Sequence, residues 1–312
     1  MSYWRSLFDY LLHRKERLAN DRSAHLDLQL SSETSHLPKG LEIEWLGTSG
    51  FRLTYEGSTI LVDPYLTRPG LFRVASGRRL VPDENLLERY VHAADAVLVG
   101  HTHFDHALDV PLVTQRFGCK AYGSKSLAAL FQGLGRPEEA VAVEPHRVYE
   151  QGPFRFSFVP SLHSKLILGR RIPYDYEISC EHAEHLGARG YGCGQVFGIR
   201  IEVAGKILYH QGSCDLIDDE IPRGSVDALL AGIAGRGFTE RYLERLFARV
   251  DPKLVIPHHY DDFFRPLDQD ISFSLNVNLS SFIEEARRVS RDVEIGTLEP
   301  TRPLVIGQAS RS

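Results

Sequence analysis

Hydrophobic and polar residues alternate with a period of two from Leu41 onward. Successive side chains of a β-strand point to opposite faces of a sheet, so this alternation predicts half-buried strands. Turn residues at 47–50 and 56–58 divide the stretch between Leu41 and Val62 into short strands. The pattern therefore predicts a β-meander that opens a globular domain.

Short apolar runs alternate with helical stretches through the rest of the chain. Such runs are typical of strands that are buried on both faces. Two successive sets of strands followed by helices predict an α/β fold, with two sheets packed face to face and helices outside. We expect strands at 96–99, 120–122, 141–143, 148–149, 154–159, 195–203, 206–210, 228–231, 254–257 and within 293–306, and helices at 108–117, 124–133, 239–250 and 279–289.

The first 40 residues do not share this pattern. Residues 1–22 have helical spacing, and residues 23–40 predict an irregular linker. We therefore expect a helix and linker at 1–40 and a main domain at 41–312. The apolar stripe of this helix packs against one of three surfaces, which the sequence leaves open: its own domain, a second subunit of a homo-oligomer, or a membrane. The stripe consists of Trp4, Leu7, Phe8, Leu11 and Leu12.

Composition narrows the class of protein and its partners. The chain has 312 residues, 43% hydrophobic and 25% charged, and no apolar run approaches the ~20 residues of a membrane-spanning helix. A net charge of −5 offers no positive field to nucleic acid, so we expect no such partner. Four cysteines are too few for a disulfide framework, and the first 20 residues lack the apolar block of a secretory signal. We expect a cytoplasmic protein with free thiols.

The densest chemical signal is the run Gly100-His-Thr-His-Phe-Asp-His106, which follows a buried strand. Three imidazoles and one carboxylate so close together offer nitrogen and oxygen ligands that suit zinc, iron or manganese. Other predicted strands also end in polar residues, at 161–164, 212–215 and 258–261. Because one loop cannot aim enough ligands at an ion, we expect these strand ends to meet at one site.

These residues resemble the metallo-β-lactamase superfamily. The resemblance rests on the H-x-H-x-D-H loop, Ser-x-His-Ser at 161–164, the glycine corner with an acid at 212–215, and Pro-x-His-Tyr at 257–260. Trp45–Phe51 and Asp63-Pro-Tyr65 are similar to the branch with ascorbate-6-phosphate lactonase and N-acylphosphatidylethanolamine phospholipase D. The resemblance covers 41 to about 265 and implies an αββα sandwich of two mixed β-sheets with a binuclear metal centre between the sheet edges.

The resemblance also implies which residues hold the two metal ions, with zinc favoured and manganese or iron as alternatives. The first ion would have His101, His103 and His163 as ligands, and the second would have Asp105, His106 and His259.

One corner departs from the family. The family has Gly-Asp-Thr there, whereas Ser213 follows Gly212 in this chain and the nearest acid is Asp215. If the loop bends enough, Asp215 bridges the two ions; if it does not, a single-metal enzyme becomes plausible. Asp63 either orients the histidine loop by hydrogen bonding or forms the turn before Pro64.

The implied chemistry is hydrolysis by metal-bound hydroxide, on an ester, lactone or phosphodiester bond of a small molecule or lipid. Asp105 would orient the water and accept its proton, and His210 would donate a proton to the leaving group. Two other activities of the same scaffold stay open, an iron-dependent oxidoreductase and a nuclease.

Residues 165–194 lack regular periodicity and predict a lid or pocket wall. Arg170 and Arg171 either pair with a phosphate or carboxylate of the substrate or are solvated. Four residues of this segment offer a separate structural zinc site as a minor alternative, although their spacing matches no standard zinc finger. They are Cys180, His182, His185 and Cys193.

Overall fold

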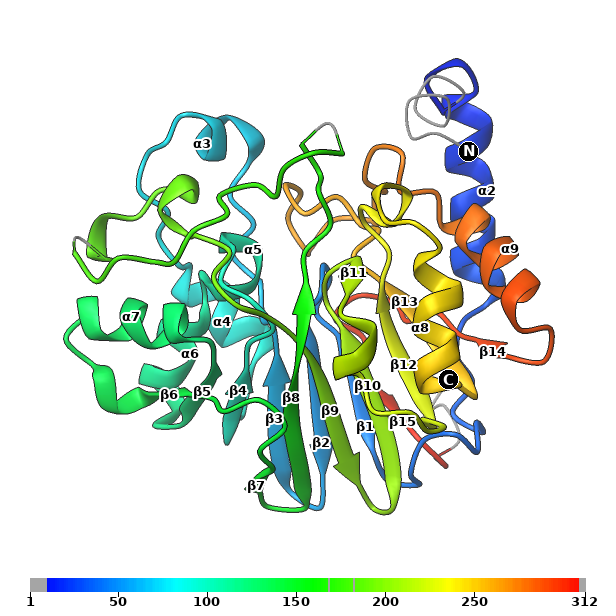
Figure 1. Ribbon diagram of the computed structural model, residues 1–312, viewed down its shortest axis with the longest axis horizontal. Helices are drawn as coiled ribbons and strands as arrows, with labels where there is room; N and C mark the ends of the chain where they lie inside the picture. The colour runs from blue at the N-terminus through cyan, green and yellow to red at the C-terminus, as the bar shows by residue number, and fades with distance from the viewer. Residues whose placement is uncertain (1–9, 168, 182, 309–312) are drawn as a thin grey trace.

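Two β-sheets lie face to face at the centre of the molecule, and helices cover their outer faces (Figure 1). The computed structural model describes residues 10–167, 169–181 and 183–308. Each sheet contains both parallel and antiparallel neighbours. The predicted fold class, an α/β sandwich of two mixed sheets, is confirmed.

The first sheet comes from the N-terminal half of the chain and one C-terminal strand, in the order β15-β1-β2-β3-β4-β5-β6. β1, β2 and β3 are antiparallel, as expected for the meander, and the strands from β3 to β6 are parallel. Their bounds are β1 (Glu42–Trp45), β2 (Phe51–Tyr55), β3 (Ser58–Val62), β4 (Ala96–Leu98), β5 (Lys120–Gly123), β6 (Ala140–Ala142) and β15 (Leu304–Val305).

The second sheet has the order β11-β8-β9-β10-β12-β13-β14, and β7 also pairs with β8. The hairpin of β9 and β10 turns at Ala204-Gly205, as predicted. The bounds are β7 (Tyr149–Gln151), β8 (Phe154–Leu162), β9 (Val196–Val203), β10 (Lys206–Gln211), β11 (Asp215–Leu216), β12 (Ala228–Gly232), β13 (Leu254–His258) and β14 (Glu294–Ile295).

The helices begin and end at residues that suit helix termini. The Ser124 hydroxyl accepts the Leu127 N–H at the start of α7, and α6 ends at Gly118 with φ of 65°. The α-helices are α2 (Arg14–Asp27), α3 (Leu71–Ala75), α4 (Glu84–Tyr90), α5 (Phe104–Ala107), α6 (Val110–Phe117), α7 (Lys125–Gly133), α8 (Tyr242–Val250) and α9 (Leu279–Val289). Short 3₁₀ helices are η1 (Pro137–Glu139), η2 (Ala183–His185), η3 (Ala188–Gly190), η4 (Asp218–Glu220) and η5 (Arg236–Phe238).

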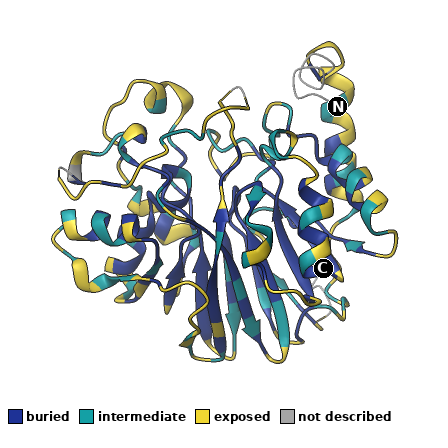
Figure 2. Cartoon of the chain, in the orientation of Figure 1, coloured by how far each residue is buried: buried dark blue, intermediate teal, exposed yellow. Residues whose placement is uncertain are grey.

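The main core fills the space between the sheets, where Figure 2 shows the strands as buried. Phe154, Phe156 and Phe158 alternate along β8 and are all buried, as the period-two pattern predicts. The Phe156 ring lies 5.1 Å, centroid to centroid, from Tyr122 on β5 of the opposite sheet. Alternate aromatic residues therefore hold the two sheets together.

Strand direction brings distant loops to one edge of the sandwich. β3 and β4 are parallel, as are β10, β12 and β13. β8 and β10 are both antiparallel to β9, so they run the same way. The carboxyl ends of β8, β10 and β13 therefore share the upper edge in Figure 1. The loops after these strands carry the candidate ligands.

The N-terminal region differs from its prediction. α2 continues to Asp27, beyond the expected end at residue 22, because Asp21 and His25 dock its second half on the domain. The Asp21 carboxylate accepts hydrogen bonds from the backbone N–H and hydroxyl of Ser280, at the start of α9. Leu11 and Leu12 of the predicted stripe are 55% and 64% exposed, and Trp4, Leu7 and Phe8 lie outside the described residues. Within the described ranges, no helix has the length and apolar character to cross a bilayer.

Candidate metal centre

The histidine loop leaves β4 through Gly100 and enters α5 with His103 as the N-cap residue. The Gly100 N–H donates to Asp63 Oδ1 at 2.7 Å. A Cβ at position 100 would lie 3.2 Å from both Asp63 Oδ2 and the Phe197 carbonyl oxygen, so the tight packing favours glycine. His101, His103 and His106 are all buried. The loop is held against two neighbouring strands before any ion binds.

Three imidazoles form the first group of candidate ligands. His101 Nε2 and His103 Nδ1 lie 3.1 Å apart. The His163 ring, at the end of β8, has its centroid 5.0 Å from that of His101 and 4.8 Å from that of His103. The structure brings these three predicted residues together from two sheets.

A carboxylate and two imidazoles form the second group. Asp105 Oδ2 lies 3.8 Å from His106 Nε2 and 3.4 Å from His259 Nε2. The two groups adjoin, because the ring centroids of His101 and His106 are 3.8 Å apart. His259, after β13, has φ of 61°, a strained conformation for a residue that is not glycine, and its buried Nδ1 has no hydrogen-bond partner.

In several of the histidine rings, one nitrogen is held by a hydrogen bond and the other is left to bind a metal ion. His106 Nδ1–H donates to Asp63 Oδ2 at 2.8 Å, and His163 Nδ1–H donates to the Ser164 carbonyl oxygen at 2.8 Å. His103 Nε2–H donates to the carbonyl oxygen of Pro173 at 2.7 Å. Metal-binding histidines show this arrangement, in which the outer acceptor sets the tautomer. Asp63 therefore occupies the position expected of a residue that orients the histidine loop by hydrogen bonding.

The electrostatics suit cations. Burial, reinforced by the neighbouring imidazoles, lowers the pKa of His101 well below its ordinary value and that of His163 to about 3. Burial would raise the pKa of Asp105, but His106 and His259 beside it hold that pKa below the usual range. The first group therefore presents neutral imidazole nitrogens, whereas in the second group burial would lower the pKa of His106 but the carboxylates of Asp63 and Asp105 raise it. This donor set fits divalent metal ions of the zinc and iron type.

The comparison with family models decides the family. Residues 42–259 match the model described as the β-lactamase superfamily domain. The chain belongs to the metallo-β-lactamase superfamily. The finer branch that the opening motifs resemble stays a prediction.

Curated relatives of this superfamily member include proteins described as metal-dependent hydrolases. One from Anaeromyxobacter sp. (strain K) is 28% identical over 276 residues, covering 84% of this chain and 86% of the relative. Another, from Thermodesulfovibrio yellowstonii, is 28% identical over 236 residues, covering 71% of this chain and 79% of the relative.

Solved structures share the fold. A metallo hydrolase from Ignicoccus hospitalis has a TM-score of 0.52 at 17% identity, covering 84% of this chain and 97% of that one. The metallo-β-lactamase fold protein YhfI from Bacillus subtilis has a TM-score of 0.53 at 17% identity, with the same coverage. CmlA, a diiron β-hydroxylase from Streptomyces venezuelae, has a TM-score of 0.55 at 16% identity, covering 86% of this chain and 55% of that one. At this identity the likeness concerns the fold alone.

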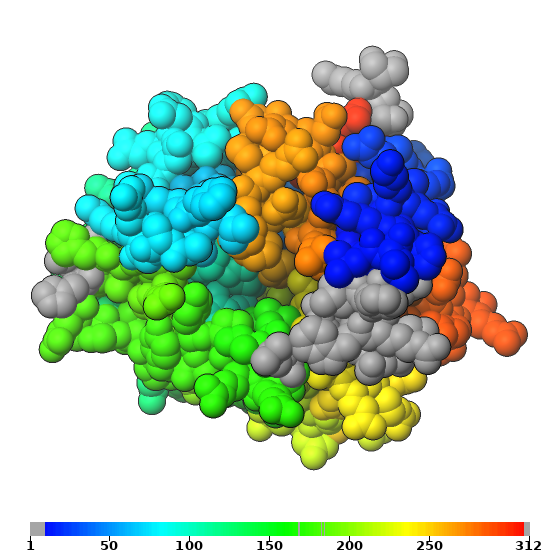
Figure 3. Space-filling view, turned by 90° about the horizontal axis from the view of Figure 1, so that it is seen from above, coloured from blue at the N-terminus to red at the C-terminus, as the bar shows by residue number. Residues whose placement is uncertain are grey.

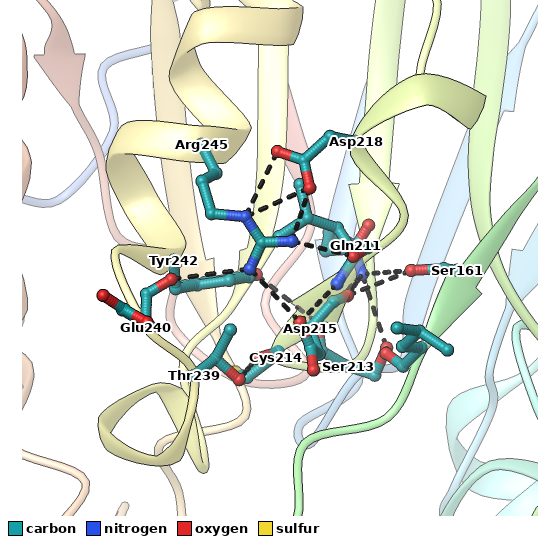
Figure 4. Close-up of polar contacts among 12 residues, drawn as sticks. Ser161, Gln211, Ser213, Cys214, Asp215, Asp218, Thr239, Glu240, Tyr242 and Arg245 are labelled. Carbon is teal, nitrogen blue, oxygen red and sulfur yellow. Dashed lines mark hydrogen bonds and ion pairs between the residues drawn. The ribbon is translucent and has the colours of Figure 1, made fainter.

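Asp215 does not join either group of this metallo-β-lactamase-like site, so its predicted bridging position is corrected. Its carboxylate lies 3.5 Å from Arg245 Nη1 (Figure 4). The reason is local: Gln211 Nε2 donates to the carbonyl oxygens of Ser213 and Asp215, which fixes the loop as a short strand beside β8. Ser213 also points away, because its hydroxyl donates to the Leu162 carbonyl oxygen.

Gly212 occupies the corner that Asp215 was expected to fill. A Cβ on Gly212 would lie 3.0 Å from Asp63 Oδ2 and 3.6 Å from His106 Cε1. The backbone at this corner therefore faces the second group without a side chain. Gly212 matches the glycine of the family's Gly-Asp-Thr, so the missing carboxylate belongs to the next position, Ser213.

His210 does not suit the predicted role of proton donor. It is fully buried, and its Nε2–H donates to the Ser49 carbonyl oxygen at 3.0 Å. Its ring stacks on His258, with centroids 4.9 Å apart, and burial lowers the pKa of both imidazoles. The proton on His210 Nε2 is committed to the backbone and faces no substrate.

The described residues of segment 165–194 form little regular structure and are hydrogen-bonded to the histidine loop. Besides the contact from His103 to Pro173, the Thr102 hydroxyl donates to the Gly192 carbonyl oxygen at 2.6 Å. Arg170 and Arg171 are exposed on this segment. Figure 3 shows a hollow on the same face of the molecule, between the cyan, green and orange segments.

Cys193 lies beside two candidate ligands of the first group, a position that the sequence analysis does not predict. One ligand atom each from Cys193, His101 and His103 lie within 4.8 Å of one another, and all three residues are buried. Cys180, its expected partner in a separate zinc site, is exposed, and His182 lies outside the described residues. The available signal was the run Gly190-Tyr-Gly-Cys-Gly194, which permits close backbone approach just before β9.

Proposed function

We propose that this protein is a metal-dependent hydrolase that cleaves an ester, lactone or phosphodiester bond in a small molecule or lipid. Family membership and the relatives described as metal-dependent hydrolases support the general class. The observation that carries the proposal is the meeting of five imidazoles and one carboxylate, from three strand ends, in two adjoining groups.

His101, His103 and His163 would hold one ion, and Asp105, His106 and His259 would hold the other. Bound divalent ions supply Lewis-acid activation of water and of the substrate oxygen under attack. The nitrogen-rich donor set favours zinc or iron over magnesium and manganese. We propose zinc in both positions.

The protein's own groups hold this centre in one geometry and receive the proton. Asp63 and the carbonyl oxygens of Ser164 and Pro173 keep the rings in one tautomer and orientation. Asp105, ionised and 3.4 Å from His259 Nε2, is the acceptor for a proton from the attacking water. Pro173 and Gly192 of segment 165–194 accept hydrogen bonds from the histidine loop, and this segment would restrict access of bulk water to the first group.

We also propose that segment 165–194 selects the substrate. Arg170 and Arg171 are exposed there and would pair with a phosphate or carboxylate of the substrate. The net charge of −5 offers no field for nucleic acid, so a small molecule or lipid is the better candidate. Contact with a membrane surface through the N-terminal residues belongs to the same proposal.

The test is a screen of lactones, phosphodiesters and acyl esters with zinc-loaded protein. We expect one class to be hydrolysed, and His103→Ala and His259→Ala to lower the rate to background. His36→Ala is the matched control, because His36 pairs with Glu294 on the surface and should keep full activity. Full activity in both ligand variants would refute the proposal.

Iron-dependent oxidation is the second candidate, because neither Ser213 nor Asp215 brings a bridging carboxylate to the two groups. A site with an incomplete bridging ligand is compatible with iron and oxygen chemistry. Stoichiometric iron in the purified protein together with oxygen consumption would favour this activity over hydrolysis. Hydrolysis without oxygen uptake would exclude it.

A further inference from the structure

A thiol lies beside the first group of candidate ligands. The potential ligand atoms of Cys193, His101 and His103 are mutually within 4.8 Å, and all three side chains are buried. Two of those atoms, His101 Nε2 and His103 Nδ1, are only 3.1 Å apart. Ligand atoms in a tetrahedral zinc site lie roughly 3.3–3.8 Å apart, given bonds of about 2.0–2.3 Å. The largest separation in this group is therefore at most about 1 Å beyond that range.

The backbone holds Cys193 against the histidine loop. The Thr102 N–H donates to the Cys193 carbonyl oxygen at 3.1 Å, and the Cys193 N–H donates to the Tyr174 carbonyl oxygen at 2.8 Å. Gly194 follows with φ of 60°, and a Cβ there would lie 3.1 Å from Thr102 Oγ1. These contacts hold the backbone of Cys193 against the histidine loop.

The other cysteines occupy different surroundings. Cys214 is also buried, but its thiol donates to the Gly232 carbonyl oxygen at 2.9 Å. Cys119 packs in the apolar cluster under the helices of the first sheet, and Cys180 is exposed. Among the described residues, Cys193 is the cysteine that joins a cluster of possible metal ligands.

We propose that the Cys193 thiolate is a ligand of the ion that His101 and His103 hold. This inference rests on the proposed function, because it assumes that the first group binds metal. The two metal positions then differ in kind: the first has a soft sulfur ligand, and the second has the carboxylate of Asp105. Soft thiolate ligands select zinc and cobalt over manganese and magnesium, so the first position would be the more selective of the two.

The test is cobalt substitution of the metal-free protein. We expect the wild type to show visible cobalt bands and a near-ultraviolet thiolate-to-cobalt charge-transfer band. Cys193→Ser should lose the charge-transfer band and keep the visible bands. Its affinity for zinc at one position should fall by at least about 10–100-fold, since removal of a hydrogen-bond partner of a metal ligand already lowers metal affinity by that factor. The controls Cys180→Ser and Cys214→Ser should keep the charge-transfer band.

The outcomes separate this inference from the proposed function. Visible bands without a charge-transfer band in the wild type, or a charge-transfer band that survives in Cys193→Ser, would overturn the inference and leave the hydrolase proposal standing. Absence of all cobalt bands would overturn both. X-ray absorption of the zinc-loaded wild type needs no variant: sulfur scattering at about 2.3 Å supports the thiolate ligand, and its absence overturns it.

Discussion

Single hydrogen bonds decide how the metal-site rings are presented. Asp63 has φ of 42°, a strained backbone that the structure tolerates while its two oxygens serve Gly100 N–H and His106 Nδ1–H. The strain and the two contacts together indicate that Asp63 serves to orient the histidine loop and the His106 ring. One carboxylate thereby fixes both the start of the histidine loop and one candidate ligand.

Asp63→Asn should weaken metal binding without unfolding the protein. The amide can still accept the Gly100 N–H, but its NH₂ group then faces the N–H of His106. We expect metal affinity to fall about 10–100-fold, measured by competition with a chelator. Asp95→Asn is the control, since Asp95 accepts the Thr59 N–H at the opposite end of β4 and β3. Equal affinities in wild type and Asp63→Asn would contradict the orienting role.

Glu44 predicts a pH-dependent stability. Burial raises the pKa of this carboxyl from 4.5 to about 7, even with Arg52 beside it. A raised pKa in the folded state stabilises the fold below about pH 4.5, and this contribution is lost as pH rises through 7. Relative to Glu44→Gln, the wild type should lose on the order of 2–3 kcal/mol between pH 5 and pH 8, measured by urea unfolding. An unchanged difference between the two pH values would refute this.

At the level of secondary structure, the fold follows from the hydrophobic pattern. Alternation along β8 and the apolar runs of β12 and β13 were sufficient to predict strands whose ends meet at one edge. Loop conformations were not predictable in this way. The side-chain amide of Gln211 fixes the loop after β10 by hydrogen bonds to Ser213 and Asp215. The alternation of polar and apolar residues along a strand does not predict such contacts.

The same reason explains why the end of α2 and the position of Cys193 were not predicted. Asp21 and His25 dock α2 through polar contacts with residues more than 230 positions away, so an apolar stripe does not mark its buried face. Cys193 lies beside His101 because its carbonyl oxygen accepts hydrogen bonds from the N–H and the hydroxyl of Thr102, 91 residues away. Local spacing predicts the candidate ligands within the 101–106 loop, and the family resemblance adds His163 and His259, but neither indicates that Cys193 lies beside His101 and His103.

Segment 165–194 should loosen when its tie to the histidine loop is removed. Thr102→Val keeps the side-chain shape and removes the two hydrogen bonds that the hydroxyl donates to the Gly192 and Cys193 carbonyl oxygens, while the Thr102 N–H still donates to Cys193. We expect faster hydrogen exchange across 170–194, with little change in the strands. Thr114→Val is the control, because its hydroxyl donates within α6 to Pro111. Unchanged exchange in the segment would show that Thr102 does not hold it.

In the molecule as a whole, the N-terminal helix supports the far side of the metal centre. His25, completely buried, lies 2.9 Å from the Tyr260 hydroxyl through Nδ1 and 3.0 Å from Glu299 through Nε2. Tyr260 follows His259 directly and packs on Trp45, with ring centroids 4.8 Å apart. Residues from both ends of the chain therefore brace the loop that carries a candidate ligand, as the adjacency of α2 and α9 in Figure 1 indicates.

His25→Ala should destabilise the protein by about 2–4 kcal/mol, because it leaves a cavity and an unpaired buried hydroxyl. His36→Ala, which removes a partly exposed pair with Glu294, should cost about 0–1 kcal/mol. Chemical denaturation of both variants measures the difference. Similar losses in the two would show that α2 does not brace the Tyr260 loop.

The metal content of the purified protein tests the central claim most directly. The two adjoining groups predict two bound ions per chain in the wild type, one fewer in His103→Ala, and one fewer in His259→Ala, by elemental analysis after loosely bound ions are removed. A wild type that binds no transition metal, or variants that keep both ions, would contradict the account.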